Sequence, residues 1–243
     1  MLGGALTNSV FGLLRASIVA ATVGAAGGSL AGYDTRTVVT YAWVTQALIA
    51  PVELFTWNEL ALRVRTGDIA IDLARPVDLQ LAWGATDLGR ALAVLLPRAL
   101  PTLAVGALSF GLVLPASAWA YPAGLVALVL AVAISFCGRF AVNLLAFWLV
   151  DIRGVNAFYV FTSNLLSGLY APVHWFPGWL AALAAATPFP SLVQAPTDVL
   201  TGHVNGTEAA RVIATQVFWL AVTLGLGRFL LHRATAKLVV QGG

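Results

Sequence analysis

Residues 122–150 read PAGLVALVLAVAISFCGRFAVNLLAFWLV, and Arg139 is the only charged residue among them. A helix needs about 20 predominantly apolar residues to cross a bilayer, so this run is long enough. The rest of the chain agrees, because 60% of its 243 residues are hydrophobic and 9% are charged, against about 45–50% and about 25% in soluble domains. Mean hydropathy is +0.89. We therefore expect an integral membrane protein.

Five further stretches are comparably apolar. Together with the first they predict six membrane-spanning helices, at about 5–31, 37–57, 91–114, 122–150, 155–172 and 209–231. The stretch 155–172 is the shortest and carries the polar residues Asn156, Ser163 and Asn164. Because lipid offers no partner to an unpaired backbone group, these runs should be helical. The predicted fold is an all-α polytopic membrane protein with a single transmembrane domain over residues 1–243.

Basic residues near the ends of the spans predict the orientation. Seven of them lie on one side, in segments 58–90, 151–154 and the tail after 231: Arg63, Arg65, Arg75, Arg90, Arg153, Arg233 and Lys237. The other side comprises 32–36, 115–121 and 173–208. It holds only Arg36, with Arg211 at the edge of the last span. The first side is therefore expected to be cytoplasmic, and both termini with it.

The external segment 173–208 is apolar but interrupted by prolines, which leave pieces too short to span. These pieces are expected to be short helices before the last span. They would dip partway into the membrane or lie at its outer surface, because lipid requires internally paired backbone. Trp175 and Trp179 suit that level, since indole prefers the headgroup zone.

Nine charged residues gather within 59–90, in the predicted cytoplasmic loop 58–90. The centre of this loop, residues 63–78, reads RVRTGDIAIDLARPVD. Gly67 and Pro76 delimit a short helix, since proline disfavours helical geometry in the residue before it. Ile69 and Leu73 share one face of that helix at i, i+4 spacing. The other face carries Asp68, Asp72 and Arg75. This amphipathic segment either binds a soluble partner or is a charged loop that maintains the topology.

Small residues recur at every fourth position of the first span and just beyond it: Gly12, Ala16, Ala20, Gly24, Gly28 and Gly32. Such a stripe lets helix backbones approach closely. It predicts a seam, formed either with a partner subunit or a moving neighbour, or with another helix of the same bundle.

Arg139 lies well inside the fourth span. A charge within the membrane is costly and usually has a partner or a water-filled cavity. Glu53, near the cytoplasmic end of the second span, is the predicted partner, and Asn143 is a further contact one helical turn from Arg139. The alternative is that Arg139 extends toward the cytoplasmic headgroups. Arg15 in the first span has the same two interpretations.

Residues that could carry catalysis or bind a metal are sparse. His174, His203 and His232 lie in separate segments, and none has a Cys or carboxylate at metal-ligand spacing. No metal site and no catalytic residue are therefore predicted. A phosphate-binding loop needs a lysine, and the only one is Lys237, so any nucleotide would be bound by another chain. The net charge of +3 is small and scattered, and we expect no nucleic-acid partner.

Several stretches carry a family resemblance. The most specific is ELALRVRTGDIAIDLARPVDLQLAW at 59–83, followed by DLGRAL at 87–92. The others are NSVFGLLRA at 8–16, GYD at 32–34 and WFPGWLAALAAATPFPSLVQAPTDVLTG at 175–202. Together they resemble ABC-2 type transporter permeases, in particular a bacterial branch, over nearly the whole chain.

The resemblance implies a membrane subunit of an ATP-binding-cassette exporter in the bacterial cytoplasmic (inner) membrane. A separate ATPase subunit would bind ATP and Mg²⁺, so this chain would need no cofactor and would not be an enzyme. Two permease chains would pair, and a heterodimer is favoured over a homodimer. The coupling helix of the family, which docks on the ATPase, falls on Arg65, Thr66, Asp68, Ile69, Asp72, Leu73, Arg75 and Asp78.

The resemblance also implies an amphipathic or lipid-like substrate, a drug or natural product, that is exported between the two permeases along spans one, two and five. The candidate lining residues are Phe158, Tyr159, Phe161 and Tyr170. Family members usually begin with an amphipathic elbow helix; the chain here starts MLGGALTNS, so that element lies upstream or is missing.

Two alternatives remain open. One is an ATP-independent secondary transporter or channel, which would need coupling charges at the midplane and often shows repeated halves. The other is a non-transporting membrane scaffold whose loop binds a soluble protein.

Overall fold

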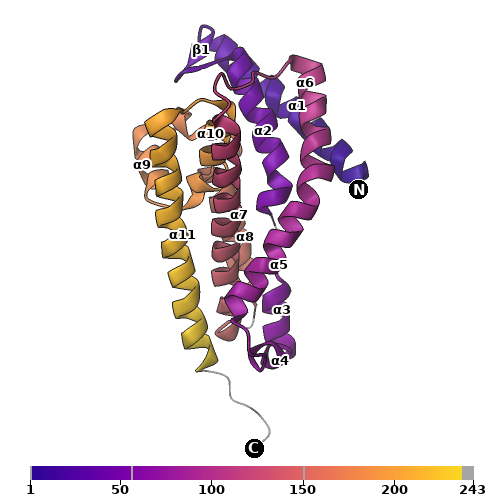
Figure 1. The fold of residues 1–243 in the computed structure, drawn as a ribbon, viewed down its shortest axis with the longest axis vertical. Coiled ribbons are helices and arrows are strands. Elements are labelled where there is room, and N and C mark those ends of the chain that lie inside the picture. The colour runs from indigo at the N-terminus through magenta and orange to yellow at the C-terminus, as the bar shows by residue number, and fades with distance from the viewer. Residues whose placement is uncertain (1, 56, 150, 237–243) are drawn as a thin grey trace, which may run out of the picture.

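The computed structural model describes residues 2–55, 57–149 and 151–236, with side chains from residue 7 onward. The chain is 77% helical, and this bears out the predicted all-α class apart from one two-stranded hairpin. The long helices run side by side in an elongated bundle (Figure 1).

The first half of the chain contains α1 (Leu2–Ala25), the antiparallel strands β1 (Ser29–Leu30) and β2 (Tyr33–Asp34), α2 (Thr35–Val52), α3 (Glu59–Thr66), α4 (Ile69–Leu73), α5 (Leu79–Val94), the π-helical turn η1 (Leu95–Ala99) and α6 (Leu100–Phe110). The second half contains α7 (Ala120–Leu144), η2 (Leu145–Phe147), α8 (Arg153–Leu166), η3 (Val173–Trp175), α9 (Gly178–Ala185), η4 (Phe189–Ser191), α10 (Gln194–Thr201) and α11 (Gly206–Thr235), where η2 to η4 are 3₁₀ turns.

Among the described residues, four helices are long and apolar enough to cross a membrane: Thr7–Ala25, Leu79–Phe110, Ala120–Phe147 and Gly206–Thr235. Six spans are therefore not confirmed. The predicted spans 37–57 and 155–172 correspond to α2, with 18 residues, and α8, with 14. At 1.5 Å per residue α8 is only about 21 Å long, short of the ~30 Å hydrocarbon core. α2 is instead largely buried among the other helices.

The third predicted span starts earlier than expected. α5, η1 and α6 form one continuous helix, so residues 79–90 are helical and do not belong to the loop 58–90. Asp78 caps the start of this helix by accepting a hydrogen bond from the backbone N–H of Leu81 at 2.8 Å. Pro97 lies in η1. Proline lacks an N–H, and the helix accommodates it by widening into a π-turn rather than ending.

α7 is the central helix and packs against both α11 and α10. Gly124 permits the close approach of α10, because a Cβ there would lie 2.3 Å from a methyl carbon of Leu200. α1, α2 and α6 pack together as a second group, and α2 joins this group to α10 and α7. The short helices η3, α9, η4 and α10 occupy the segment before the last span, as the prolines predicted.

The two ends of the bundle differ in charge. α3, α4 and the C-terminal end of α11 lie at one end, and the β1–β2 hairpin lies at the other (Figure 1). The first end carries Arg63, Arg65 and Arg75 of the predicted cytoplasmic loop, together with Arg233. Clustering of basic residues at one end is what the positive-inside rule requires. The orientation of this end toward the cytoplasm stays a prediction.

The small-residue stripe divides into two parts. Helix α1 ends at Ala25, so Gly28 and Gly32 lie in the hairpin region, with φ of 93° and 83°. Within the helix, Gly12 and Ala16 are buried against α2, whereas Gly24 is exposed. The first half of the stripe is thus a seam inside this bundle. The four-residue spacing of the small residues continues to Gly32, so it did not show that α1 ends at Ala25.

Gly12 and Gly24 provide a matched pair for testing this seam. A Cβ on Gly12 would lie 2.6 Å from the ring of Trp43. That ring is fully buried and also packs closely against Gly106 of α6. We expect Gly12→Ala to destabilise the protein by about 1–3 kcal/mol through overpacking. Nothing lies within 4 Å of a Cβ on Gly24. There we expect Gly24→Ala to stabilise the helix by about 0.5–1 kcal/mol. Thermal unfolding of the two detergent-solubilised variants should shift in opposite directions; equal shifts would contradict the seam.

Candidate functional site

The segment predicted to dock on a partner forms a hairpin of helices α3 and α4. α3 ends at Gly67, whose φ of 85° lies in the left-handed region that favours glycine. Arg63 of α3 and Asp72 of α4 form an ion pair, with Nη2 and Oδ1 3.0 Å apart. This pair closes the hairpin. Asp72, expected on the docking face, is consequently only 9% exposed and turned toward α3.

The apolar face of α4 anchors the hairpin to the bundle. Ile69 is 1% exposed and belongs to a buried cluster with Leu60 of α3 and Phe140 of α7. Leu73 packs at the edge of the same cluster. The hairpin is therefore held on a rigid base and is not a free loop.

Asp78 has a second structural role besides capping α5. Its Oδ2 accepts a hydrogen bond from Nη1 of Arg228 in α11, at 2.8 Å. Of the eight residues predicted to contact the ATPase, Asp72 and Asp78 thus have partners within the chain. Four others are exposed: Arg65, Thr66, Asp68 and Arg75.

Sequence reasoning missed three apolar residues on the outer surface of the hairpin. Leu62, Ile71 and Val77 are 58%, 59% and 59% exposed. Ile71 follows the buried Ile69 by two positions and so falls on the opposite face of α4. This spacing in the sequence could have predicted that Ile71 is exposed. A cavity of about 280 Å³, lined in part by Arg75, Val77 and Trp83, opens beside the last of the three apolar residues. Exposed apolar side chains next to charged ones are a feature of interaction surfaces.

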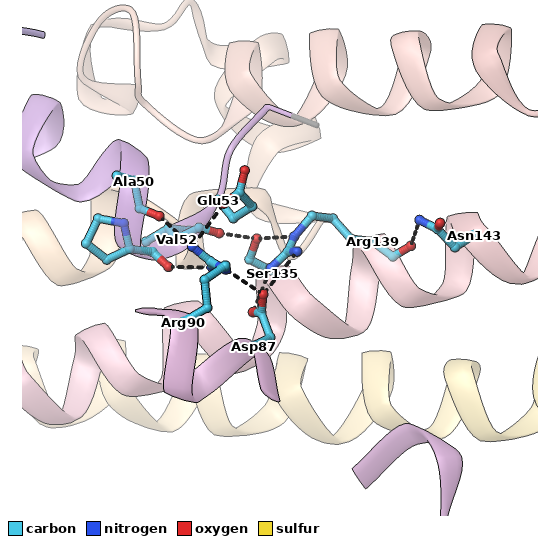
Figure 2. A network of polar contacts seen from close by, with 9 residues as sticks. Ala50, Val52, Glu53, Asp87, Arg90, Ser135, Arg139 and Asn143 are labelled. Atoms are coloured by element: carbon cyan, nitrogen blue, oxygen red, sulfur yellow. Dashed lines mark hydrogen bonds and ion pairs between the residues drawn. The ribbon is translucent and has the colours of Figure 1, made fainter. Parts of the chain in front are cut away.

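A network of charges lies where α2, α5 and α7 meet (Figure 2). Nη2 of Arg139 in α7 lies 2.8 Å from Oδ2 of Asp87 in α5, and the two side chains are 3% and 4% exposed. Oδ1 of Asp87 also accepts a hydrogen bond from Nε of Arg90, at 3.0 Å. Arg90 in turn pairs with Glu53 at 2.9 Å. Two positive and two negative charges therefore neutralise one another.

The expected direct pair of Arg139 with Glu53 is wrong. Asp87 and Arg90 lie between them in the network, because α5 begins at Leu79 and places residue 87 against α7. Asn143, expected as a further contact of the Arg139 charge, donates instead to the backbone carbonyl of Arg139 at 2.9 Å. The Arg139 guanidinium also lies over the ring of Trp57, 5.7 Å from the centroid.

The network also supplies hydrogen-bond donors to the last backbone carbonyls of α2. Arg90 donates to the carbonyls of Ala50 and Pro51 at 2.9 and 3.1 Å, and Ser135 donates to that of Val52 at 2.7 Å. The chain leaves the helix at Glu53 with a φ of 55°, so the last carbonyls of α2 lie where the helical hydrogen-bond ladder ends, and that of Ala50 also accepts the backbone N–H of Glu53 at 3.3 Å. Unpaired backbone groups in lipid are costly, so the charges stabilise the point at which α2 ends.

A second cavity, of about 550 Å³, lies between α1, α2 and the turn after α8. Phe11, Ile49, Phe55 and Leu169 are among its apolar lining, and Asn8, Arg15 and Gln46 are among its polar lining. Arg15 donates to Gln46 Oε1 at 2.9 Å, to Thr45 Oγ1 at 3.0 Å and to the carbonyl of Leu169. Its Nε is buried without a hydrogen-bond partner, and Arg15 has no carboxylate partner in the part of the chain that the structure describes.

The four aromatic residues predicted to line a substrate path do not come together. Tyr170 lines this cavity. Phe158 and Phe161 are 71% and 63% exposed on the outer surface of α8, and neither lines the cavity. Tyr159 packs against Gly138 of α7 and lies 5.8 Å, between ring centroids, from Phe189.

Two of the three histidines, expected in separate places, meet at the end of the bundle that carries the β-hairpin. Nε2 of His174 lies 3.0 Å from Oδ2 of Asp198. His203 lies beside them, with its ring 5.3 Å from that of His174. The hydrogen bond to Asp198 raises the pKa of His174, whereas partial burial lowers the pKa of His203. Sequence separation hid this cluster, because η3 and the turn after α10 come together only in the fold.

Comparison with known proteins supports the resemblance noted in the sequence. No curated protein and no solved structure gives a significant match to the chain. The family described as ABC-2 family transporter protein matches residues 12–242, nearly the entire length. The matched range includes the α3–α4 hairpin, the charge network and Arg15, while Asn8 and Phe11 of the second cavity lie before it. The chain belongs to the ABC-2 family of transporter proteins.

Proposed function

We propose that the chain is the permease subunit of an ATP-binding-cassette exporter in the bacterial cytoplasmic membrane. A separate ATPase docks on the α3–α4 hairpin and supplies the ATP hydrolysis, and a second, different permease completes the transmembrane part. Both termini lie in the cytoplasm. The cargo is an amphipathic or lipid-like compound that moves outward.

The anchored α3–α4 hairpin is the observation that carries this proposal. Ile69 and the Arg63–Asp72 pair hold it rigidly at the basic end of the bundle. Its outer surface still presents Arg65, Arg75 and Ile71. A surface whose buried side is anchored and whose exposed side carries both charged and apolar residues suits recognition of a soluble partner.

The hairpin is connected to the bundle by hydrogen bonds that could transmit its movement. Asn143 of α7 accepts from the backbone N–H of Ala61 in α3 at 3.0 Å and donates to the carbonyl of Trp57 at 2.8 Å. Asp78 links the start of α5 to α11. α5 continues through η1 into α6 and so reaches the opposite end of the bundle (Figure 1). We infer that a rigid-body shift of the hairpin moves this long helix, as in other packed two-state elements.

The cavity beside Arg15 suits an amphipathic cargo. Its wall is mainly apolar, and its polar end carries a guanidinium without a carboxylate partner among the described residues. An acceptor-rich or anionic headgroup would pair with Arg15 while an alkyl or aryl part contacts Phe11 and Phe55.

Co-purification tests the proposal. The tagged chain would be isolated in mild detergent from its native host as wild type, Arg75→Glu and Ile71→Asp. Arg36→Glu serves as the matched control. Arg36 is exposed near the start of α2, next to the β1–β2 hairpin and at the opposite end of the bundle from α3 and α4. We expect an ATPase subunit with the wild type and with Arg36→Glu, and a loss of at least about 10-fold with the two hairpin variants, since interface hot spots are typically worth 2 kcal/mol or more.

Two results would contradict the proposal. One is the absence of any ATPase when the wild type is folded and monodisperse. The other is equal recovery of the ATPase with all four proteins, which would place the docking surface elsewhere. Asp72→Arg is a poorer probe, because it would break the internal pair with Arg63. Mass spectrometry of the same complex would show whether a second permease of different sequence is present.

A further inference from the structure

The cluster of His174, Asp198 and His203 has the composition of a metal site. The three residues come from η3, from α10 and from the turn that follows α10. One ligand atom of each lies within 4.8 Å of the other two. Two imidazoles and a carboxylate, with a position left for water, are a ligand set that divalent zinc accepts. We propose that these three side chains form a divalent-metal site, for which Zn²⁺ is the best match.

The surrounding residues orient the carboxylate as a ligand. Oδ1 of Asp198 accepts a hydrogen bond from Gln194 Nε2 at 2.7 Å and from the Tyr33 hydroxyl at 3.1 Å. Oδ2 is thereby left facing His174. Gln194 is itself held, because its Oε1 accepts from the Tyr41 hydroxyl at 2.7 Å and from the backbone N–H of Val173 at 2.8 Å. Outer-shell partners of this kind fix the direction of a metal-binding carboxylate.

The histidine rings are positioned but can still adjust. His203 is stacked on Tyr33, with centroids 4.3 Å apart and planes inclined by 8°. The side chain of His174 is 42% exposed and can rotate. Ligands at about 2.0–2.1 Å from a tetrahedral ion lie roughly 3.3 Å from one another. His174 Nε2 and Asp198 Oδ2 are already 3.0 Å apart. Because all the ligand atoms lie within 4.8 Å of one another, no pair needs to close by more than about 1.5 Å. A cavity of about 260 Å³ reaches His174 and Asp198 and offers an entry path.

A bound ion would join three parts of the chain at this end. The three ligands belong to η3, to α10 and to the connection into α11, and Asp198 also reaches the β-hairpin through its hydrogen bond with Tyr33. Metal coordination would therefore stabilise the end of the bundle that lies opposite the α3–α4 hairpin. The inference concerns this chain alone and does not depend on the proposed transport function.

Zinc titration of the purified full chain tests the site. The protein would carry no polyhistidine tag, would be stripped with EDTA and would be dialysed before ZnCl₂ is added. We expect one zinc per chain by elemental analysis and a zinc-dependent rise in Tm that EDTA reverses. His174→Ala and His203→Ala should weaken binding by more than about 100-fold. Tyr33→Phe should weaken it by about 10-fold, as outer-shell changes do.

The third histidine is the matched control. His232 is exposed near the C-terminal end of α11, and His232→Ala should bind zinc like the wild type. The proposal is overturned if the wild type binds no stoichiometric zinc at micromolar concentration. It is equally overturned if His174→Ala and His203→Ala, both folded by size-exclusion chromatography, bind as the wild type does. Cobalt in place of zinc gives a second readout, a visible absorption band whose intensity reports tetrahedral coordination.

Discussion

Replacing Asp87 with leucine is expected to lower the free energy of unfolding by about 3–5 kcal/mol, because it leaves the buried Arg139 charge without its partner. Arg139 and Asp87 are 3% and 4% exposed in their side chains and lie 2.8 Å apart. A charge stranded in a low-dielectric interior cannot recover its hydration. Folded yield and the midpoint of thermal unfolding in detergent would measure the loss.

Two further variants separate this pair from its neighbours. Glu53→Gln should cost no more than about 1 kcal/mol, since the Glu53 and Arg90 side chains are 28% and 27% exposed and Arg90 keeps its pair with Asp87. The double variant Asp87→Leu with Arg139→Leu should recover most of the stability, because apolar replacement of a buried pair is often neutral or stabilising. If Glu53→Gln is as damaging as Asp87→Leu, or if the double variant shows no recovery, the assignment of Asp87 as the partner of Arg139 fails.

Replacing Arg15 with leucine is expected to weaken binding of an anionic amphiphile about 10- to 100-fold, and this expectation rests on the proposed function. Hydrogen bonds to a charged group contribute about 1.5–3 kcal/mol each, and 1.4 kcal/mol corresponds to a factor of ten. Arg15 is the cation among the residues lining the 550 Å³ cavity. A fluorescent long-chain fatty acid added to the detergent-solubilised protein is a suitable probe, with Kd as the readout.

Matched variants distinguish a binding role of Arg15 from a structural one. Arg15→Lys keeps the charge and should retain part of the affinity, although it loses the fork that reaches Gln46 and Thr45. Phe158→Ala should leave binding unchanged, because Phe158 is 71% exposed outside the cavity, whereas Tyr170→Ala should weaken it. Equal affinity of wild type and Arg15→Leu, with both proteins folded, would exclude this cavity as the binding site for anionic cargo.

The sequence indicated the membrane class and the short helix α4 because both follow from local patterns. The apolar runs of α7 and α11 exceed the length of a bilayer span whatever they pack against. Gly67 and Pro76 bound a short helix because of their own backbone preferences, and α4 lies between them. Family membership followed from similar local stretches, and it holds over residues 12–242.

Helix limits and spans were predicted less well. Hydropathy grouped 37–57 and 155–172 with the spanning helices, yet α2 and α8 are shorter than the runs that suggested them. α8 ends at Leu166, and Gly168 follows with a φ of 87°. Hydropathy measures the preference of side chains for lipid, and a buried helix inside the bundle satisfies that preference equally well.

By itself, then, the sequence determined an apolar helical protein, an excess of basic residues in the predicted cytoplasmic segments and a short amphipathic helix in the loop 58–90. Only the tertiary structure decided which distant side chains meet. Asp87 and Arg139 are 52 residues apart, and His174 and Asp198 are 24 apart. Such pairs depend on where helices begin and how they cross, which no local propensity encodes. A buried charge or imidazole takes the partner that packing brings within reach, so its identity is a property of the fold.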